Sequence, residues 1–550
     1  MVSKTLHKTY FASPNRLLNF FLLSLFMTTN FFANFWLSRF EPDIHHDGYV
    51  LAGAIAASEG LLPNRDFFTQ YGPLGPLLQG FWLQLTSPTL LNLRILNALL
   101  ITLNFTVAIM LVAKNWSFRF SILVVSTIAF SYTSVLPPML PWTSVLLTST
   151  LLFALILLRK PDHHRKSIYS PNFFFAGLVL GVGIYIRIHG LFVIMAVATF
   201  LLLQRSLIKL GSLLGGFVFT VFIATLIQWK TNSLSAFIQQ VFVSPFTDYT
   251  SNGNYPLKTQ IVNLFLLFSS FIYLLLLVLS IFCIKKIIVG TKESASKKAF
   301  SWLLFSVTSV LAYTLGTRIA NLPVADRSFL NPQYFLYFFS NNWRHLLAYC
   351  AVAVLLLQLR NVFGDLKIRL KADKHVPFFF ALGTLTQLFP TADYFHLWWI
   401  TPVLVVCCAQ VIPQERARMF LVPALMTSVL LANLLFFVDF VSTPRYLVTS
   451  TVAKNMYTSN LGLQTSLEAA VRNVPPGEGY FHCNHGIFAV ADGKYLPTHW
   501  DFVNWGPQFP NKENRSGRHF YCDSNVDEIG STGRVLWRDP TGTAFIILKE

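Results

Sequence analysis

Long apolar runs separated by short polar loops occupy most of the first 440 residues. A helix that crosses a bilayer needs about 20 apolar residues, because the hydrocarbon core offers no partner for an unpaired backbone N–H or C=O. By this criterion the sequence predicts thirteen spanning helices, at residues 17–37, 93–113, 119–136, 139–158, 172–187, 190–204, 211–229, 260–284, 300–317, 343–359, 376–389, 397–412 and 418–440. We therefore expect an α-helical polytopic membrane protein.

The distribution of Lys and Arg agrees with this prediction. Cytoplasmic loops of membrane proteins are enriched in basic residues, so rich and poor loops should alternate along the chain. With residues 1–16 in the cytoplasm, the loops expected inside hold 23 of the 42 basic residues. The odd number of spans then places residues 441–550 outside. The first apolar run is too deep in the chain and too long for a cleaved signal peptide, and we expect a signal anchor.

The first exterior loop, residues 38–92, is long enough to contain structure of its own. Its segment 73–87 is short and carries Pro and Gly, so we expect it to lie along the outer interface instead of crossing the membrane. Residues 47–60 have the pattern of a helix that is half-buried at the same interface.

Beyond residue 441 the apolar runs shorten, and Asn, Asp, Gly and Pro become frequent. A helix is predicted at 461–472, and short strands are predicted at 479–482, 487–491, 534–538 and 543–548. The chain thus divides into a cytoplasmic N-terminus (1–16), a transmembrane domain (17–440) and a small α/β extracytoplasmic domain (441–550), whose size is ordinary for a domain.

Composition supports the membrane class and argues against nucleic-acid binding. Hydrophobic residues make up 54% of the chain, charged residues 12%, and the mean hydropathy is +0.53. The net charge of +18 is spread over short clusters between apolar runs, which is typical of cytoplasmic anchors. Cys483 and Cys522 of the polar C-terminal region are either a disulfide in an oxidising compartment or two free thiols.

Acidic residues and histidines gather in the first exterior loop: Glu41, Asp43, His45, His46, Asp47, Glu59 and Asp66. Asp47 would lie at the N-terminus of the predicted helix, as a helix cap, as a catalytic group or as both. Asp43, His45, His46 and Asp47 are also of the types that bind divalent metals, although their spacing matches no metal motif. Asp66 is either functional or a solvated loop carboxylate.

Two further groups of polar residues lie at predicted outer ends of spans. In PTADYFHLWWITP, the two Trp are typical of an interfacial aromatic belt, whereas Asp393 and His396 favour a site, because ionisable residues at membrane depth are costly. In GVGIYIRIHGLF, Arg187 either binds a phosphate by bidentate contacts or extends to the outer surface, and His189 accompanies it.

Motifs of the first loop follow one another in a fixed order: Asp47, Tyr49, Glu59-Gly60, Pro63, Arg65-Asp66, Tyr71-Gly72-Pro73-Leu74 and, at the next span, Arg94. The glycine-spaced GLVLGVGIYIRIHG at 177–190 and the late loop PTADYFHLWWITP follow them. This order resembles the GT-C superfamily of membrane glycosyltransferases. It is most similar to glycosyltransferase family 39, which includes dolichyl-phosphate-mannose-protein mannosyltransferases, and to the aminoarabinose transferases.

The resemblance implies a transferase that uses a polyprenyl-phosphate-linked sugar at the outer face, with an acidic residue of the first loop as general base. A carboxylate at the lipid interface would take a proton from an acceptor hydroxyl while the anomeric carbon loses its phosphate leaving group. Asp47 is the preferred base, Asp43 the second choice and Asp66 a helper. The family commonly has an Asp-Glu pair four residues before the Tyr, and here His45-His46 stands in that place.

Substrate-binding residues are expected among His45, His46, Tyr49, Arg65, Tyr71, Arg94, Arg187, His189, Asp393 and His396. Of these, Arg65, Arg94 or Arg187 would surround the phosphate. The expected partners are the donor lipid, membrane lipids and an acceptor that is a glycan, a lipid or a protein. The only cofactor that the residues suggest is a divalent metal. The protein is expected in the inner or plasma membrane, with its active site and C-terminus outside.

Two other functions remain open from the sequence. One is a polysaccharide polymerase or ligase that uses its first loop in a similar way. The other is a transporter or flippase for lipid-linked sugars, without covalent chemistry. Transporters usually carry ionisable residues at the membrane midplane on broken helices, whereas the acids here lie in an exterior loop, which favours an enzyme.

Overall fold

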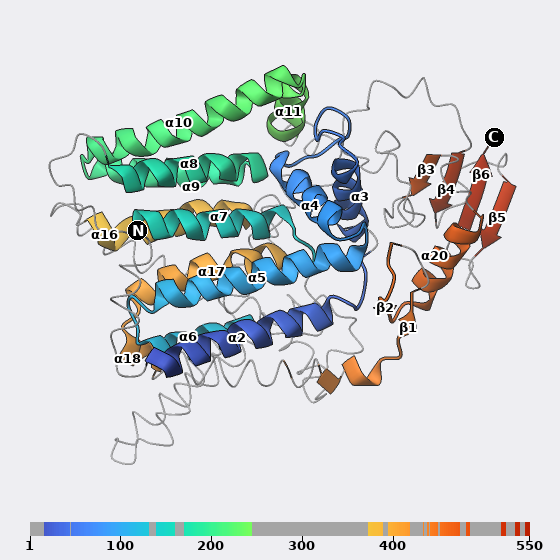
Figure 1. Cartoon of the computed structure of the whole chain (residues 1–550), viewed down its shortest axis with the longest axis horizontal. Coiled ribbons are helices and arrows are strands. Elements are labelled where there is room, and N and C mark those ends of the chain that lie inside the picture. Colours follow the sequence, from blue (N-terminus) through green and yellow to red (C-terminus); the bar gives the residue numbers. More distant parts are fainter. Residues whose placement is uncertain are drawn as a thin grey trace, which may run out of the picture.

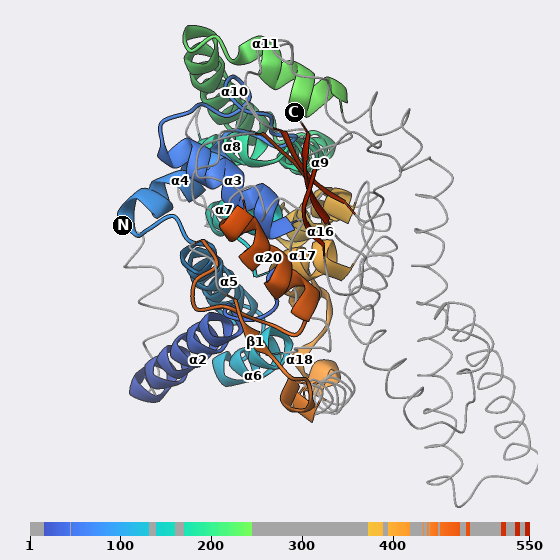
Figure 2. The same cartoon turned by 90° about the vertical axis from the view of Figure 1, so that its right-hand side faces the viewer.

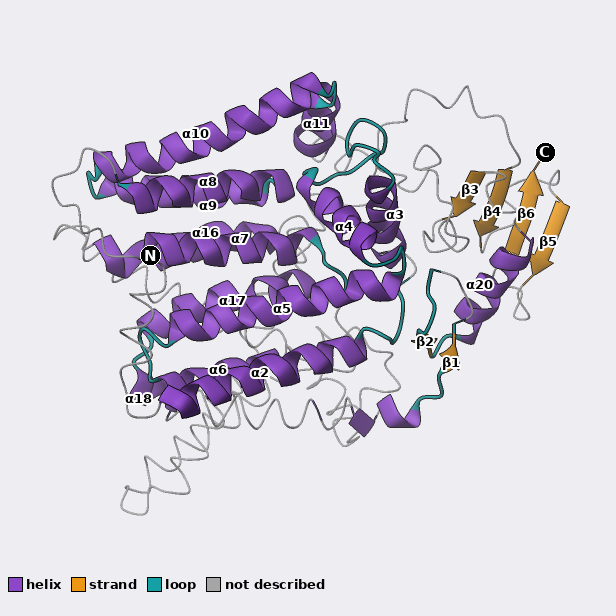
Figure 3. Cartoon of the chain, in the orientation of Figure 1, coloured by secondary structure: helices purple, strands orange, loops and turns teal. Residues whose placement is uncertain are grey.

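The computed structural model describes residues 16–43, 46–130, 139–159, 170–244, 372–388, 394–418, 433, 437–438, 440–448, 452–473, 480–483, 519–523, 534–538 and 545–549. Within these ranges the chain is mostly helical, and a small β-sheet lies near the C-terminus (Figure 3).

Nine of the thirteen predicted spans contain a helix: α2 (Arg16–Leu37), α5 (Leu90–Val112), α6 (Phe118–Ala129), α7 (Thr143–Leu158), α8 (Pro171–Ile186), α9 (His189–Leu203), α10 (Leu207–Lys230), α16 (Ala372–Thr384) and α17 (Tyr394–Val411). The predicted spans at 260–284, 300–317 and 343–359, and most of 418–440, lie outside the described residues. Short helical turns complete this part of the chain: α11 (Leu234–Phe237), η1 (Ile238–Val243), η3 (Leu385–Leu388) and α18 (Gln414–Arg416).

Among the described helices, three are long and apolar enough to cross a bilayer: Leu17–Leu37, Leu90–Val112 and Leu207–Lys230. Other apolar helices, such as α7, α8 and α9, are shorter. Phe219 and Phe222 of α10 are 55% and 57% exposed, as expected of side chains that face lipid instead of water.

The long helices run side by side in a bundle, and two short helices of the first loop lie across one end of it (Figure 1). These are α3 (His46–Ser58) and α4 (Leu74–Leu85). Figure 2 looks onto this end and shows α3, α4 and the later helix α20 (Leu461–Asn473) in front of the bundle. By the predicted topology it is the extracytoplasmic end.

Glycine brings two helices of the bundle into backbone contact. A Cβ on Gly177 of α8 would lie 2.0 Å from the carbonyl oxygen of Leu213 in α10. Small residues at such contacts let membrane helices pack closely without a hydrophobic driving force. Gly181 likewise faces Thr220 of α10, so these two glycines serve the packing of α8 on α10, whereas Gly183 faces Leu147 of α7.

The helix predicted at 47–60 exists as α3, but it is more deeply buried than the expected interfacial helix. Ten of its 13 residues are buried, including Leu51, Ile55 and Asp47. Neighbouring α4 approaches it at Gly80, where a Cβ would lie 2.7 Å from that of Ala57. Phe67 also packs on the helix, so α3 lies in the interior of the protein. The segment 73–87 forms α4 and does not cross the bundle, as expected.

The C-terminal region contains α20 and a four-stranded sheet in the order β3-β4-β6-β5, with strands β3 (Tyr480–Cys483), β4 (His519–Asp523), β5 (Arg534–Arg538) and β6 (Phe545–Lys549). The helix and three of the predicted strands are confirmed, β4 was not predicted, and 487–491 lies outside the described residues. Strands β3 and β4 are parallel, and their register pairs position 483 with position 522. Neighbouring strands of a sheet lie about 4.8 Å apart, and a disulfide spans Cα atoms at about that distance. The backbone register is thus compatible with the disulfide that was one of the two alternatives for Cys483 and Cys522.

Candidate active site

Arg94, in the first turns of α5, pairs with Asp47 of α3. Its Nη2 donates to Oδ2 of Asp47 at 2.5 Å, and its Nε donates to Oδ1 at 3.3 Å. Both side chains are buried, with exposures of 1% for Arg94 and 0% for Asp47. The pair therefore joins the first exterior loop to a helix of the bundle at a place that solvent does not reach.

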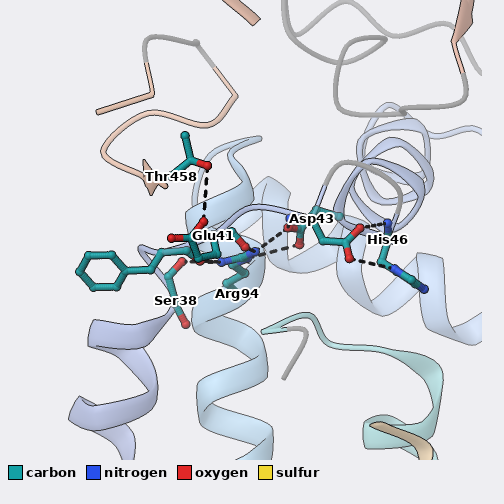
Figure 4. Close-up of polar contacts among 8 residues, drawn as sticks. Ser38, Glu41, Asp43, His46, Arg94 and Thr458 are labelled. Carbon is teal, nitrogen blue, oxygen red and sulfur yellow. Dashed lines mark hydrogen bonds and ion pairs between the residues drawn. The ribbon is translucent and has the colours of Figure 1, made fainter. Parts of the chain in front are cut away.

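The other N–H groups of Arg94 bind the chain that leads into the loop. Nη1 donates to the carbonyl oxygens of Ser38 and Phe40 at 3.1 and 2.7 Å, and Nη2 donates to that of Glu41 at 3.0 Å. Figure 4 shows the guanidinium among these groups. A guanidinium has five N–H donors, and here all five are used within the protein. Arg94 thus has no donor left for a substrate phosphate.

Asp43, not Asp47, caps helix α3. Its Oδ1 accepts a hydrogen bond from the backbone N–H of His46 at 2.7 Å, while Oδ2 of Asp47 accepts from the N–H of Asp43 at 2.6 Å. The two carboxylates thus satisfy backbone donors in the manner of a capping box. Burial raises the pKa of the Asp47 carboxyl, and the Arg94 guanidinium acts against this effect.

Asp43 and His46 form the accessible part of this cluster. Nδ1 of His46 lies 3.1 Å from Oδ2 of Asp43, and the two side chains are 40% and 41% exposed. Asp43 differs from the other two carboxylates considered for catalysis, because its side chain is exposed and contacts a histidine, whereas Asp47 is buried and Asp66 pairs with an arginine. A carboxylate held in this way can reach a hydroxyl group that arrives from outside.

Asp66 pairs with its neighbour Arg65. Nε and Nη2 of Arg65 donate to the two carboxylate oxygens at 2.7 and 2.8 Å, and the backbone N–H of Leu62 donates to Oδ2 at 2.7 Å. The guanidinium of Arg65 holds the pKa of Asp66 below its ordinary value. Nη1 of Arg65 also donates to the carbonyl of Thr231 just after α10, at 3.3 Å. Arg65 and Asp66 thus fasten the loop to α10.

An aromatic pocket lies beside α3, lined by Tyr49, Val50, Gly53, Phe67, Phe68, Thr69, Tyr71, Pro76, Gln79, Trp142 and Thr143. Trp142 joins it to the Asp43–His46 pair, because its ring centroid lies 5.5 Å from that of His46. The rings of Tyr71 and Tyr49 lie 5.5 and 6.1 Å from Trp142. Trp399 of α17 stacks on Trp142 at 5.9 Å.

Arg187, at the C-terminal end of α8, lies behind one wall of this pocket. It is 2% exposed, its Cζ lies 5.4 Å from the ring centroid of Tyr71, and its Nε donates to Nδ1 of His189 at 3.1 Å. Its Nη1 donates to Oγ of Ser144, the residue after Thr143. Arg187 and His189 are therefore held at the pocket and do not extend to the outer surface.

The end of α8 is also fixed to the loop by backbone contact. The N–H of Gly72 donates to the carbonyl of Ile186 at 3.2 Å. A Cβ on Gly72 would lie 2.0 Å from the carbonyl oxygen of Tyr185. Position 72 therefore requires glycine, and this contact sets where Tyr71 stands relative to Arg187.

Some predicted residues lie outside the described part of the chain. These are His45, Asp393 and the side chain of His396. In the same late segment, Trp399 is 5% exposed and packs against Trp142, so it does not belong to an interfacial belt.

Sequence reasoning missed Trp142, Thr143 and Ser144. The run 139–158 was apolar enough to be taken as one span, although α7 begins only at Thr143. The signal was present in Pro137, Pro138 and Pro141, since Pro is disfavoured inside a helix. A turn was therefore to be expected at the outer end of this span.

Beyond the bundle, the described residues 440–448 and 452–460 bind the start of the first loop, and we call this part of the chain the C-terminal strap. Its strands β1 (Tyr446–Leu447) and β2 (Tyr457–Thr458) form an antiparallel pair. The N–H of Glu41 donates to the carbonyl of Tyr457 at 2.8 Å, and the N–H of Tyr457 donates to that of Arg39 at 2.7 Å. The Glu41 carboxylate accepts hydrogen bonds from the backbone N–H of Ser459 at 3.1 Å.

Of the residues considered for a metal site, Asp43, His46 and Asp47 are described, and they do not form a set of ligands with one another; His45 lies outside the described residues. Within the described ranges, no three side chains of His, Cys, Asp or Glu come together as a set of metal ligands. Both carboxylate oxygens of Asp47 contact Arg94, and those of Asp43 contact His46. The structure thus gives no positive support to a divalent cofactor.

No family model matches the sequence, and no curated protein matches it. Two solved structures with some similarity are of the Archaeoglobus fulgidus oligosaccharyltransferase. The one with Zn and sulfate has 12% sequence identity and a TM-score of 0.42, and covers 83% of this chain and 56% of that chain. The apo form has 12% identity and a TM-score of 0.43, and covers 90% of this chain and 65% of that chain. The chain thus spans less than two thirds of that protein's length, and at these scores the likeness decides nothing about function.

Proposed function

We propose that this protein is a membrane glycosyltransferase that moves a sugar from a polyprenyl-phosphate donor to an acceptor hydroxyl at the outer face of the membrane. The observation that carries the proposal is the arrangement at one end of the bundle. There the exposed Asp43–His46 pair, an aromatic pocket and the buried cation of Arg187 adjoin one another. The order of motifs in the first loop, which resembles the GT-C superfamily, agrees with this arrangement.

Asp43 is the general base in this proposal. Its carboxylate takes the proton of the acceptor hydroxyl, whose oxygen then forms a bond to the anomeric carbon of the donor sugar. The bond from that carbon to the phosphate oxygen breaks, and the phosphate leaves with the electron pair. His46 orients Asp43 through its Nδ1. Arg187, a cation held by Ser144 and His189, stabilises the negative charge that develops on the phosphate.

Asp47, the base first expected from the sequence, becomes an anchor in this proposal. Its exposure of 0% and its two contacts with Arg94 leave no path for an acceptor hydroxyl. Arg94 likewise positions the loop and does not bind the phosphate. Asp66, expected as a helper, fastens the loop together with Arg65.

The test is to replace Asp43 by Asn and to follow sugar transfer in membranes from a polyprenyl-phosphate donor with a radioactive sugar. A positioned general base contributes roughly 100-fold or more, so Asp43→Asn should lower transfer by at least that factor. Glu59→Gln, at an exposed carboxylate directly after α3, is the matched control and should keep the parent rate. Transfer at the parent rate by Asp43→Asn would refute Asp43 as the base.

The same assay separates the proposal from a flippase, the alternative of another class. A flippase would move the radioactive lipid across the membrane and form no new glycosidic bond. Recovery of all radioactivity in the unchanged donor lipid, together with its movement across the bilayer, would therefore contradict the proposed chemistry.

A further inference from the structure

We infer that a single water molecule is a fixed part of the candidate site, bound in the aromatic pocket between the indole N–H of Trp142 and the hydroxyl of Thr143. The inference does not depend on the proposed function, because it concerns how the pocket wall is held. The sequence predicted no role for either residue, and neither takes part in the proton transfer above.

Two buried polar atoms of the pocket wall have no partner in the described part of the protein. They are Nε1 of Trp142 and Oγ1 of Thr143. Trp142 is 7% exposed, Thr143 is 5% exposed, and both residues line the pocket. Buried polar groups are nearly always hydrogen-bonded, so two such atoms on adjacent residues indicate a bound partner.

The turn that carries these atoms is held on several sides. Its backbone N–H at Trp142 donates to the carbonyl of Leu140 at 2.7 Å, and the side chain of Gln79 in α4 donates to the carbonyl of Pro141 at 2.6 Å. Helix α4 also packs closely on Thr143, since a Cβ on Gly75 would lie 3.1 Å from its Cγ2. The two polar atoms therefore keep their places at the pocket wall.

The cavity has room for one water molecule. The space that the centre of a water molecule can occupy is about 20 Å³. A buried site needs at least about 10–15 Å³ of such space to hold one water. A sugar ring is far larger than this cavity, so the pocket supports the site and does not receive the sugar.

Water matches the hydrogen-bonding groups of the wall. The indole N–H of Trp142 can only donate, and a water oxygen accepts from it. The Thr143 hydroxyl both donates and accepts, so it pairs with the same water in either sense. A buried water needs two to four polar partners, whereas a purely apolar cavity stays dry. The two atoms thus supply the minimum that a bound water requires.

An ion fits this cavity less well than water does. None of the residues that line the pocket carries an ionised side chain. Arg187 lies behind the ring of Tyr71, and its Nε and Nη1 donate to His189 and Ser144. An anion would exchange its hydration for two hydrogen bonds from the wall, which is costly. Water is therefore favoured over an anion.

The water has a consequence for the proposed base, because Trp142 joins several parts of the site. Its ring lies 5.5 Å from that of His46, the partner of Asp43, and stacks on Trp399 of α17 at 5.9 Å. A hydrogen bond at Nε1 fixes the indole in its plane. The water thus helps to hold the ring against which His46 packs.

A structure of the full chain in lipid nanodiscs, at a resolution that shows ordered water, tests the site directly. We expect one density peak of the size of a water, at about 2.7–3.2 Å from both Nε1 of Trp142 and Oγ1 of Thr143. Ordered water elsewhere in the interior, with no density in this cavity, would overturn the inference. A larger continuous density in the cavity would overturn it as well.

The sign of one stability change is a second test. If a water binds Oγ1, Thr143→Val removes a hydrogen bond and should lower the thermal midpoint by about 1–2 °C. If the hydroxyl is unpaired, the same variant removes an unsatisfied buried group, and a midpoint that is unchanged or raised would refute the water. Thr150→Val is the matched control in the same helix and should shift the midpoint little, because the Thr150 hydroxyl donates only to the nearby carbonyl of Leu147, at 2.6 Å.

Salt distinguishes water from an anion. With water in the cavity, replacing chloride by gluconate at equal ionic strength should change the thermal midpoint of the parent and of Thr143→Val by the same amount. A stabilisation by chloride that the parent shows and Thr143→Val lacks would assign the cavity to an anion and overturn the inference. None of these measurements involves sugar transfer, so their outcome leaves the proposed function to its own test.

Discussion

Asp47 and Arg94 bind each other through two contacts, at 2.5 and 3.3 Å, in a place that neither water nor lipid reaches. They belong to different helices, α3 and α5, and each also holds backbone groups of the loop entry. This pair fixes where the proposed base, Asp43, stands above the bundle.

Asp47→Asn should destabilise the protein more than any change at the surface of the loop. Removing one partner of a buried ion pair leaves the other charge uncompensated and costs about 3–5 kcal/mol. The thermal midpoint, followed by size-exclusion chromatography in detergent, should fall clearly, and Glu59→Gln, at an exposed carboxylate of the same loop, should shift it little. An Asp47→Asn protein with parent stability and no transfer activity would instead make Asp47 a participant in the chemistry.

Asp66 should give the stability of the loop a dependence on pH. Its pKa is below the ordinary value of 3.8, first because of the hydrogen bonds from Arg65. A lowered folded pKa contributes stability that is present above the unfolded value and is lost as pH falls through the folded value. The difference in thermal midpoint between the parent and Asp66→Asn should therefore be positive at pH 7, should begin to shrink as pH approaches 3.8, and should vanish only below the lowered pKa of the folded state. A difference that persists at low pH would contradict this role.

Gly72→Ala should damage the site although it adds one methyl group. The new Cβ would meet the carbonyl oxygen of Tyr185 at 2.0 Å, so the loop must move away from α8. Transfer activity and thermal stability should both fall. Gly211→Ala is the matched control, because a Cβ at Gly211 meets nothing within 4 Å and alanine favours the helix α10 by about 1 kcal/mol. Equal stability of the two variants would refute the close contact.

Glu41→Gln should loosen the C-terminal strap. Glu41 has a backbone φ of 48°, which is unfavourable for a residue with a side chain, and its carboxylate lies 3.4 Å from Nε of Arg445. With the charge removed, limited proteolysis should cut within residues 440–460 faster than in the parent. Transfer should fall as well, since Asp43 is two residues away. Glu59→Gln should change neither rate, and unchanged proteolysis in Glu41→Gln would show that the backbone contacts alone hold the strap.

The membrane helices could be predicted because apolar length is a property of the local sequence. The same holds for α20, which ends before two prolines. Strand β4, the segment HFYCD, was missed because its polar residues and its length of five give no clear alternation.

The site could be predicted only in part, because its partners are distant in the sequence. Local spacing indicated the acidic loop, Tyr71 and Arg187, and these do lie around one pocket. Local spacing could not show that Arg94 pairs with Asp47, because the two residues are 47 positions apart and no neighbouring residue indicates the contact. The deep burial of α3 was in principle visible, because a helix composed of small and apolar residues on all sides belongs in an interior.

The strap has a consequence for synthesis. On the predicted topology, Glu41 reaches the outer surface early, whereas Arg445, Tyr457 and Ser459, which bind it, are synthesised only after the predicted transmembrane domain. A product that ends before residue 445 lacks the three residues that contact Glu41, so its first loop is not bound by the strap. Under the proposed function, we therefore expect transfer to begin only once the chain has been translated nearly to its end, and products that end before residue 445 to leave the donor lipid unused.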